Sequence, residues 1–149
     1  MDNFNVLFTV MSMDNDFLRK ARRIHFIGIG GIGVSAIARM MLGEGKKVSG
    51  SDRSPSAIID ELKRLGAKFF LGHNADNVGN DVDLIVYTPA VDFKNPELKK
   101  AKQISIPCFS YPEILGIISK NKYTIAVSGT HGKTTTTAMI GKILIDAKK

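Results

Sequence analysis

The sequence predicts an α/β fold: a doubly wound, five-stranded parallel sheet followed by the first strand, phosphate loop and helix of a second α/β domain. Short apolar runs alternate strictly with segments whose apolar residues recur at helical spacing, which is typical of a parallel sheet with helices on both faces. A glycine-rich turn joins the first apolar run to the first helical segment. A Gly-Lys-Thr turn stands between a strand-like run and a helical segment near residue 132, and it indicates the second domain.

The glycine-rich turn occupies residues 28–33. Gly28, Gly30 and Gly33 match the G-x-G-x-x-G pattern of Rossmann-like domains, and Gly31 adds a fourth glycine. Glycines turn the chain sharply, let the backbone approach a phosphate, and let the helix pack closely against the strand. The unpaired N–H groups at the start of that helix favour an anion. The turn therefore predicts a site for the diphosphate of a nucleotide or dinucleotide.

The same alternation places the other elements in order along the chain. The expected strands are residues 24–29, 47–51, 67–71, 83–88 and 107–110, and the expected helices are residues 14–22, 33–43, 54–66, 95–102 and 111–118. Residues 72–77 are expected to form a loop or one short helical turn. Right-handed crossovers between these strands predict the order 3-2-1-4-5.

Ligands of such sheets bind at the carboxyl ends of the strands, next to the switch in strand order. Asp52 ends the second strand, 19 residues beyond Gly33, where a carboxylate accepts hydrogen bonds from ribose hydroxyls. His73 and the segment 88–90 follow the third and fourth strands. Two interpretations of His73 stay open, a nucleotide contact or an ordinary loop residue, and His25 is either a packed strand residue or a ligand.

A second unit begins after the polar joint at residues 119–122. Residues 123–127 are expected to form a sixth strand, and a Gly-Lys-Thr turn and an apolar-faced helix follow it. In a P-loop, backbone N–H groups hold the β-phosphate of ATP, Lys133 would bridge the β- and γ-phosphates, and Thr134 would reach Mg²⁺. Val127 stands where the full pattern has its first glycine, and a Thr-rich helix start with a capping lysine is the alternative interpretation.

Composition limits the classes of function. The chain has 149 residues, about one domain, with 44% hydrophobic and 23% charged residues, as in soluble globular proteins. Its one cysteine, Cys108, excludes an internal disulfide and suits a reducing, cytoplasmic setting, most simply as a small buried hydrophobe. No apolar run approaches the roughly 20 residues of a membrane span, and the first residues lack the features of a signal peptide.

The formal net charge of +7 raises the question of nucleic acid. Lysines and arginines are scattered along the chain, and aromatic residues do not interleave with them as a stacking platform requires. The charge therefore favours a solvated, lysine-rich surface around an anionic small-molecule site over a nucleic-acid partner.

Two phosphate loops in series resemble the arrangement found in the Mur ligases of peptidoglycan synthesis. The resemblance runs from about residue 24 to the end of the sequence, and it rests on residues 25–33, 50–52, 72–73, 88–90, 95–97 and 129–136. The last segment, Gly-Thr-His-Gly-Lys-Thr-Thr-Thr, is highly specific, and Asn-Pro-Glu at 95–97 is moderately so. Within the family, these segments resemble the members that join L-alanine to UDP-N-acetylmuramate.

The resemblance implies three domains, which bind the UDP-sugar, ATP and the amino acid in turn. Residues 23–119 would be the first, residues 120–149 the truncated start of the second, and residues 1–22 an N-terminal extension. The implied reaction is phosphorylation of the muramate carboxylate by ATP, giving an acyl phosphate that the amine of L-alanine attacks. This chain alone is expected to bind the UDP-sugar and to be inactive, because the acidic metal ligands, the adenine pocket and the amino-acid domain are missing from it.

The resemblance also implies a role for individual residues. Lys133 would be catalytic, neutralising charge as the γ-phosphoryl group moves, and Thr134 would hold Mg²⁺. The implied ATP-binding residues are Gly129, Thr130, Gly132, Lys133, Thr134 and Thr135. The implied UDP-sugar-binding residues are Gly28, Gly30, Gly31, Ile32, Gly33, Asp52, His73, Thr88 and Ala90, with Asp52 and His73 near ribose or uracil.

Two other functions compete with this interpretation. An NAD-binding module would explain the glycine turn and Asp52 but not Lys133, and a nucleic-acid-binding protein would explain neither loop. An apolar edge strand at residues 123–127 favours pairing with another chain, so a homodimer through residues 123–149 is also expected.

Overall fold

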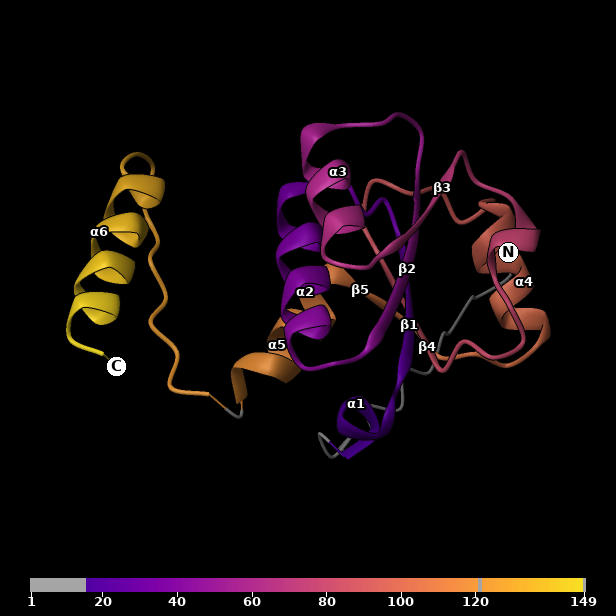
Figure 1. Ribbon diagram of the computed structural model, residues 1–149, viewed down its shortest axis with the longest axis horizontal. Coiled ribbons are helices and arrows are strands. Elements are labelled where there is room, and N and C mark those ends of the chain that lie inside the picture. Colours follow the sequence, from indigo (N-terminus) through magenta and orange to yellow (C-terminus); the bar gives the residue numbers. More distant parts are fainter. Residues whose placement is uncertain (1–15, 121, 149) are drawn as a thin grey trace, which may run out of the picture.

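The computed structural model describes residues 16–120 and 122–148. Five strands form one parallel sheet in the order β3-β2-β1-β4-β5 (Figure 1). They are β1 (Arg23–Ile27), β2 (Lys47–Asp52), β3 (Lys68–Leu71), β4 (Leu84–Tyr87) and β5 (Cys108–Ser110). The predicted sheet, its parallel pairing and its strand order are confirmed.

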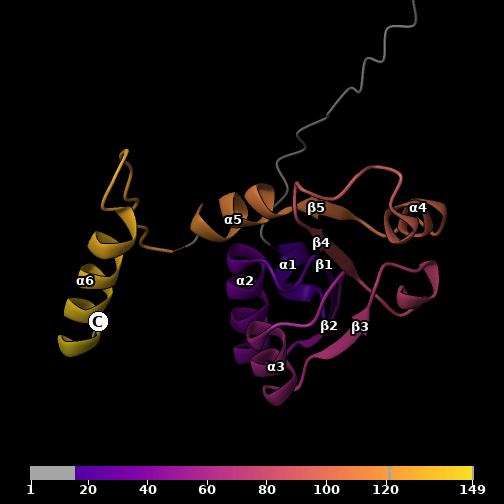
Figure 2. The same cartoon turned by 90° about the horizontal axis from the view of Figure 1, so that it is seen from above.

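Helices cover both faces of this sheet, as predicted (Figure 2). The helices of the described residues are α1 (Asp16–Lys20), α2 (Ile32–Gly43), α3 (Ala57–Arg64), α4 (Pro96–Gln103), α5 (Tyr111–Lys120) and α6 (Lys133–Asp146), and η1 (Ala75–Asn77) is a 3-10 turn. Of these, α6 does not cover the sheet. The helices α2, α3 and α5 lie on one face, and α4 and η1 lie on the other. Two hydrophobic cores result, one on each side of the sheet.

The alternation of side chains along β1 divides its residues between these cores. Ile24 and Phe26 pack in the larger core with α2, α3 and α5. Ile27 points the opposite way, into the smaller core under α4. His25 shares that second face, and the strand register puts it beside Ser49 of β2. Polar side chains from two central strands therefore lie under α4.

Capping residues set where α3 and α4 begin. The Ser56 hydroxyl accepts a hydrogen bond from Ile59 N at 3.3 Å, so α3 begins at Ala57, later than the sequence predicted. Asn95 caps α4, and its Oδ1 accepts a hydrogen bond from Glu97 N at 2.8 Å. The Asn-Pro-Glu segment is thus a helix start whose third residue enters the first turn.

The helix α1 packs against the sheet domain. Leu18 is buried in the larger core, and the Phe17 ring stacks on Phe109 with 5.1 Å between centroids. The Lys46 ammonium donates hydrogen bonds of 2.8 Å to the carbonyls of Leu18 and Ala21. The described end of the expected extension therefore contributes to the core. The helix α1 ends at Lys20, before the end of the predicted helix at 14–22, whose first residues lie outside the described part.

The predicted sixth strand at residues 123–127 is wrong. This segment has no regular secondary structure, and Tyr123 is 97% exposed. A strand requires a neighbour for its backbone groups, and no strand of the described part pairs with it. The segment leads to α6, which stands apart from the sheet in both views and exposes Met139 and Ile143 (Figures 1 and 2).

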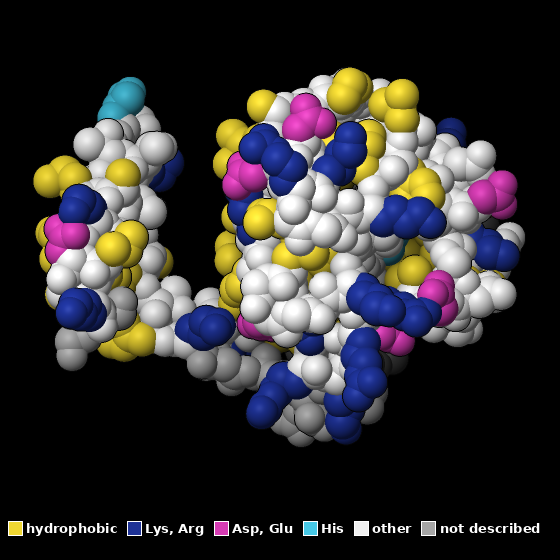
Figure 3. All heavy atoms as spheres, viewed as in Figure 1, with side chains coloured by type: hydrophobic (Ala, Val, Ile, Leu, Met, Phe, Trp, Pro, Cys, Tyr) yellow, Lys and Arg dark blue, Asp and Glu magenta, His cyan; other side chains and the backbone are white. Residues whose placement is uncertain are grey.

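Lys and Arg side chains appear on several parts of the surface in Figure 3, most densely around α1. Within residues 16–120 and 122–148, no helix has both the length and the apolar character needed to cross a membrane.

Candidate nucleotide-binding site

The turn between β1 and α2 is held in place by backbone hydrogen bonds. Gly28 adopts φ +80°, a left-handed conformation, and its N–H donates to Ser51 O at 2.8 Å. The Gly31 N–H donates to Gly28 O at 3.1 Å. Gly31 is the N-cap of α2, which has no side-chain cap and no acidic residue in its first turn. The first N–H groups of α2 are therefore suited to an anion.

Each glycine of the G-x-G-x-x-G pattern has its own close neighbour. A β-carbon at Gly28 would overlap the Thr88 methyl group. At Gly30 it would lie 2.9 Å from Asp52 Oδ2. At Gly33 it would lie 2.6 Å from the ring of Tyr111, at the start of α5. The third glycine therefore lets α2 pack closely against α5, whereas the sequence predicted close packing of α2 against the preceding strand.

The Asp52 carboxylate contacts the turn directly. Its Oδ2 accepts a hydrogen bond from Gly30 N at 2.9 Å, and its Oδ1 accepts one from Arg53 N at 2.7 Å. The carboxylate thus joins the end of β2 to the glycine turn. Each oxygen retains acceptor capacity for a hydroxyl donor of a ligand.

A pocket of about 380 Å³ lies at this edge of the sheet, within the size range of small-molecule sites. The predicted residues that line it are Gly28, Gly30, Gly31, Asp52, His73, Thr88 and Ala90. Ile32 and Gly33 do not line it, although they form the adjoining first turn of α2, where the Ile32 side chain is 84% exposed. The structure therefore gathers most of the predicted set from four separate segments.

Arg53 also lines the pocket, and its place beside Asp52 at the carboxyl end of β2 made it a candidate from the sequence. Sequence reasoning missed Ser54, Ser56 and Val91, which line the pocket as well. These three also follow β2 or β4, so their place after a strand was a signal that could have found them. Their side chains belong to loops whose exact path the pattern of apolar residues does not specify.

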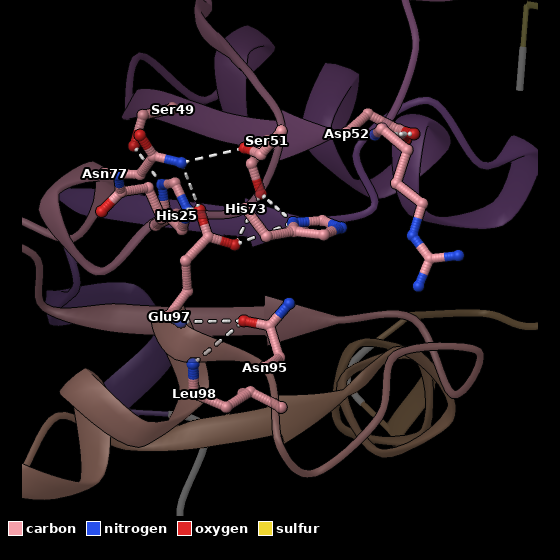
Figure 4. Close-up of polar contacts among 12 residues, drawn as sticks. His25, Ser49, Ser51, Asp52, His73, Asn77, Asn95, Glu97 and Leu98 are labelled. Carbon is pink, nitrogen blue, oxygen red and sulfur yellow. Dashed lines mark hydrogen bonds and ion pairs between the residues drawn. The ribbon is translucent and has the colours of Figure 1, made fainter.

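A buried polar cluster supports His73 from beneath the pocket (Figure 4). Glu97 has no exposed surface, and its Oε2 accepts a hydrogen bond from the Ser51 hydroxyl at 2.7 Å. His73 Nδ1 lies 3.1 Å from the same oxygen and 3.0 Å from Ser51 Oγ. Glu97 Oε1 accepts a hydrogen bond from Asn77 Nδ2 at 2.7 Å. His25 Nε2 lies 3.5 Å from Oε1, at the outer limit of a hydrogen bond, and is otherwise unpartnered.

The environment of Glu97 favours its charged form. Burial by itself raises the pKa of the carboxyl group, but hydrogen bonds from His25, Ser51 and Asn77 and the charge of His25 lower it by more. The net pKa of Glu97 lies below its ordinary value. Sequence reasoning noted Glu97 within Asn-Pro-Glu but assigned it no role. For His25 it left open a packed strand residue or a ligand, and the structure shows a fully buried strand residue.

The residues predicted to bind ATP lie elsewhere. None of them lines the pocket described above. Gly132 adopts φ +78° directly before α6, and the Lys133 ammonium donates to the carbonyls of Gly129 at 2.6 Å and Thr130 at 3.3 Å. The Lys133 side chain therefore folds back over its own loop, where its ammonium group bonds backbone carbonyls. It is predicted to contact a phosphate of ATP in that loop. Thr134 and Thr135 lie in the first turn of α6, which has no side-chain cap.

Similarity to known proteins extends over the sheet domain and beyond it. The model of the Mur ligase family, catalytic domain, matches residues 23–123. The chain is 53% identical over 136 residues to the UDP-N-acetylmuramate–L-alanine ligase of Clostridium tetani and 49% identical over 128 residues to that of Sulfurihydrogenibium sp.. These matches cover 91% and 86% of the chain but 30% and 28% of the relatives, so the chain spans about a third or less of their length.

Solved structures of ligases are also similar to this chain. The crystal structure of a UDP-N-acetylmuramate–alanine ligase from Thermotoga maritima matches with a TM-score of 0.79 and 40% identity, over 85% of this chain and 30% of that one. A murein peptide ligase from Psychrobacter arcticus matches with a TM-score of 0.77 and 28% identity, over 85% of this chain and 27% of that one.

Proposed function

Because the chain belongs to the Mur ligase family, we propose that it is the UDP-sugar-binding part of an ATP-dependent ligase. The proposed reaction joins L-alanine to the carboxylate of UDP-N-acetylmuramate in peptidoglycan synthesis, through an acyl phosphate. The pocket beside the glycine turn is the observation that most strongly supports binding of the UDP-sugar. It combines an uncapped helix start, suited to a diphosphate, with the Asp52 carboxylate and the His73 ring, which suit a nucleoside.

We assign the two units different ligands. Residues 23–119 would bind the UDP-sugar, and residues 120–149 would begin the ATP-binding domain. In that domain Lys133 would neutralise charge on the transferred phosphoryl group. Pairing of two copies through residues 123–149 and a cytoplasmic location remain predictions. The pairing now rests on the exposed apolar side chains of α6, such as Met139 and Ile143, because residues 123–127 form no strand.

The Thr134 hydroxyl suits Mg²⁺, which prefers oxygen ligands and would supply further charge neutralisation. Within the described residues, no group of three or more His, Cys, Asp and Glu side chains is placed to hold a metal ion. Thr134 would therefore act together with phosphate oxygens, water or ligands from elsewhere in the enzyme.

The ligase reaction is proposed for the longer enzyme that the relatives represent. This chain spans about 30% of their length, so we propose that it binds the UDP-sugar by itself but does not complete the reaction. Phosphate release with UDP-N-acetylmuramate, L-alanine and MgATP tests this point. Turnover of about 1 per second or more, a rate typical of enzymes, would contradict it.

A comparison of melting temperatures with UDP-N-acetylmuramate, NAD and ATP tests the ligand assignment. A ligand that binds only the folded chain raises its melting temperature. We expect a clear rise with the UDP-sugar and none with NAD. Equal rises with the two would favour a dinucleotide-binding module and overturn the assignment.

A further inference from the structure

The contacts of Glu97 fix the direction of hydrogen bonding around His73. A carboxylate only accepts hydrogen bonds, so the Ser51 hydroxyl must direct its one proton to Glu97 Oε2. The remaining contacts of Ser51 Oγ and Glu97 Oε2 with His73 Nδ1, at 3.0 and 3.1 Å, then require a proton on Nδ1. The other ring nitrogen, Nε2, is left for the pocket that His73 lines.

The Glu97 carboxylate is itself held from its other oxygen. The Asn77 amide donates to Oε1 and also to Gly72 O at 3.1 Å, so its NH₂ group is committed to two acceptors. Hydrogen-bond donors therefore face both oxygens of Glu97. A glutamine at this position would present one oxygen and one NH₂ group, so it would place a donor against a donor on one side.

We propose that Glu97 is a positioning residue: it holds His73 as the Nδ1–H tautomer, with Nε2 directed into the pocket to accept a hydrogen bond from an N–H or O–H group of the nucleoside. The inference rests on the proposed function, since it assigns the same pocket to a nucleoside diphosphate. Figure 4 shows the His73 ring extending from Ser51 and Glu97 toward the side of the pocket where Asp52 lies. The donor on the ligand is a pyrimidine imide N–H or a ribose hydroxyl.

A double-mutant cycle with Glu97→Gln and His73→Ala tests whether the two residues act as a unit. UDP-N-acetylmuramate affinity is measured by calorimetry for the wild type, both single variants and the double variant. We expect each single variant to bind about tenfold more weakly and the double variant to be no weaker than His73→Ala alone. Losses that multiply in the double variant would show that Glu97 does not act through His73 and would overturn the inference.

Ser49→Ala is the matched control. It removes a hydroxyl from the same buried cluster, the one that contacts His25 Nδ1 at 2.9 Å, but in the described part of the chain no hydrogen bond joins the Ser49 side chain to Glu97 or His73. We expect its affinity to stay within about twofold of the wild type. If Glu97→Gln does not fold, Glu97→Asp takes its place in the cycle, because the shorter side chain keeps the charge but withdraws the carboxylate from His73 Nδ1 and Ser51 Oγ. Wild-type protein that fails to bind the UDP-sugar would instead refute the proposed function.

The tautomer itself is measured on the ligand-free protein. Two-bond ¹⁵N–¹H spectra at pH 8.5 should show protonated Nδ1 and unprotonated Nε2 for His73 in the wild type and in Ser49→Ala. Glu97→Gln should give a mixture. A wild-type His73 protonated on Nε2 would overturn the inference, whatever the ligand.

Modified nucleotides identify the donor. UDP is compared with its N3-methyl, 2′-deoxy and 3′-deoxy analogues. We expect one of these changes to weaken wild-type binding about tenfold and to have no effect in His73→Ala. If all the analogues bind the wild type as UDP does, His73 Nε2 accepts no nucleoside hydrogen bond and the inference is wrong.

Discussion

Gly28 and Gly132 both adopt left-handed backbone conformations in turns that lead into a helix, with φ of +80° and +78°, yet their surroundings differ completely. A β-carbon at Gly28 would overlap Thr88, whereas one at Gly132 would meet nothing within 4 Å. The first turn is enclosed by β2, β4 and α5. The second joins a segment without secondary structure to α6, which stands apart from the sheet (Figure 1).

The glycine pattern of a phosphate loop is therefore enough to set the local backbone conformation, but not to place other segments of the chain around the loop. Both turns adopt the conformation that their glycines allow. Only the first has neighbouring strands, and these place Asp52, His73 and Thr88 around it. In the loop at Gly132, the Lys133 ammonium group bonds the Gly129 carbonyl, but no described strand lies beside the loop.

The largest difference is expected in stability. Phe26→Ala removes a fully buried ring and should lower the free energy of unfolding by about 3–5 kcal/mol. Ile143→Ala, at a residue that is 65% exposed on α6, should change it by less than about 0.5 kcal/mol. Urea denaturation followed by far-ultraviolet circular dichroism measures both. A loss of several kcal/mol in Ile143→Ala would show that α6 is packed after all.

The two left-handed glycines give a second, smaller contrast. Gly28→Ala adds backbone strain and a clash with Thr88, and should cost about 2–4 kcal/mol. Gly132→Ala adds strain only to a turn outside the sheet domain, so the unfolding of that domain should shift by less than about 0.5 kcal/mol. The same denaturation experiment applies. Similar losses in the two variants would remove the distinction between the turns.

The dependence of stability on pH gives the smallest contrast. The folded-state pKa of Glu97 is lowered, so its contribution to stability is fully present above the unfolded value of about 4.3 and is lost as the pH falls through the folded value. Glu97→Gln should lack this part of the acid destabilisation. Asp146→Asn, which removes an exposed carboxylate paired with Lys142 on α6, should keep it. Urea unfolding curves recorded from pH 6 to pH 3 measure the free energy of unfolding of each variant. The same pH dependence in the wild type and in Glu97→Gln would contradict this role of Glu97.

The sequence was sufficient for the features that depend on local pattern. Alternating apolar runs predicted the sheet and its order, and the glycine spacing predicted a turn whose neighbours include Asp52 and Thr88. It was insufficient where partners distant in the chain decide the outcome. Residues 123–127 have the composition of a strand, but a strand forms only beside another one. The role of Glu97 depends on donors from β2 and η1 that no local pattern connects to α4.

The central claim is that the enclosed glycine turn, not the loop at Lys133, binds the UDP-sugar. Gly31 is suited to test it, because its φ of −66° is open to any residue and an added β-carbon would meet nothing closer than Gly28 O at 3.4 Å. Gly31→Glu should therefore fold and place a carboxylate in the diphosphate site. Lys133→Ala is the matched change in the other loop.

Calorimetric titration of UDP-N-acetylmuramate into the wild type and both variants is the most direct measurement. We expect Gly31→Glu to bind at least about 100-fold more weakly, a loss of about 2.7 kcal/mol, and Lys133→Ala to bind within about twofold of the wild type. Unchanged affinity in Gly31→Glu, or a comparable loss in Lys133→Ala, would contradict the claim.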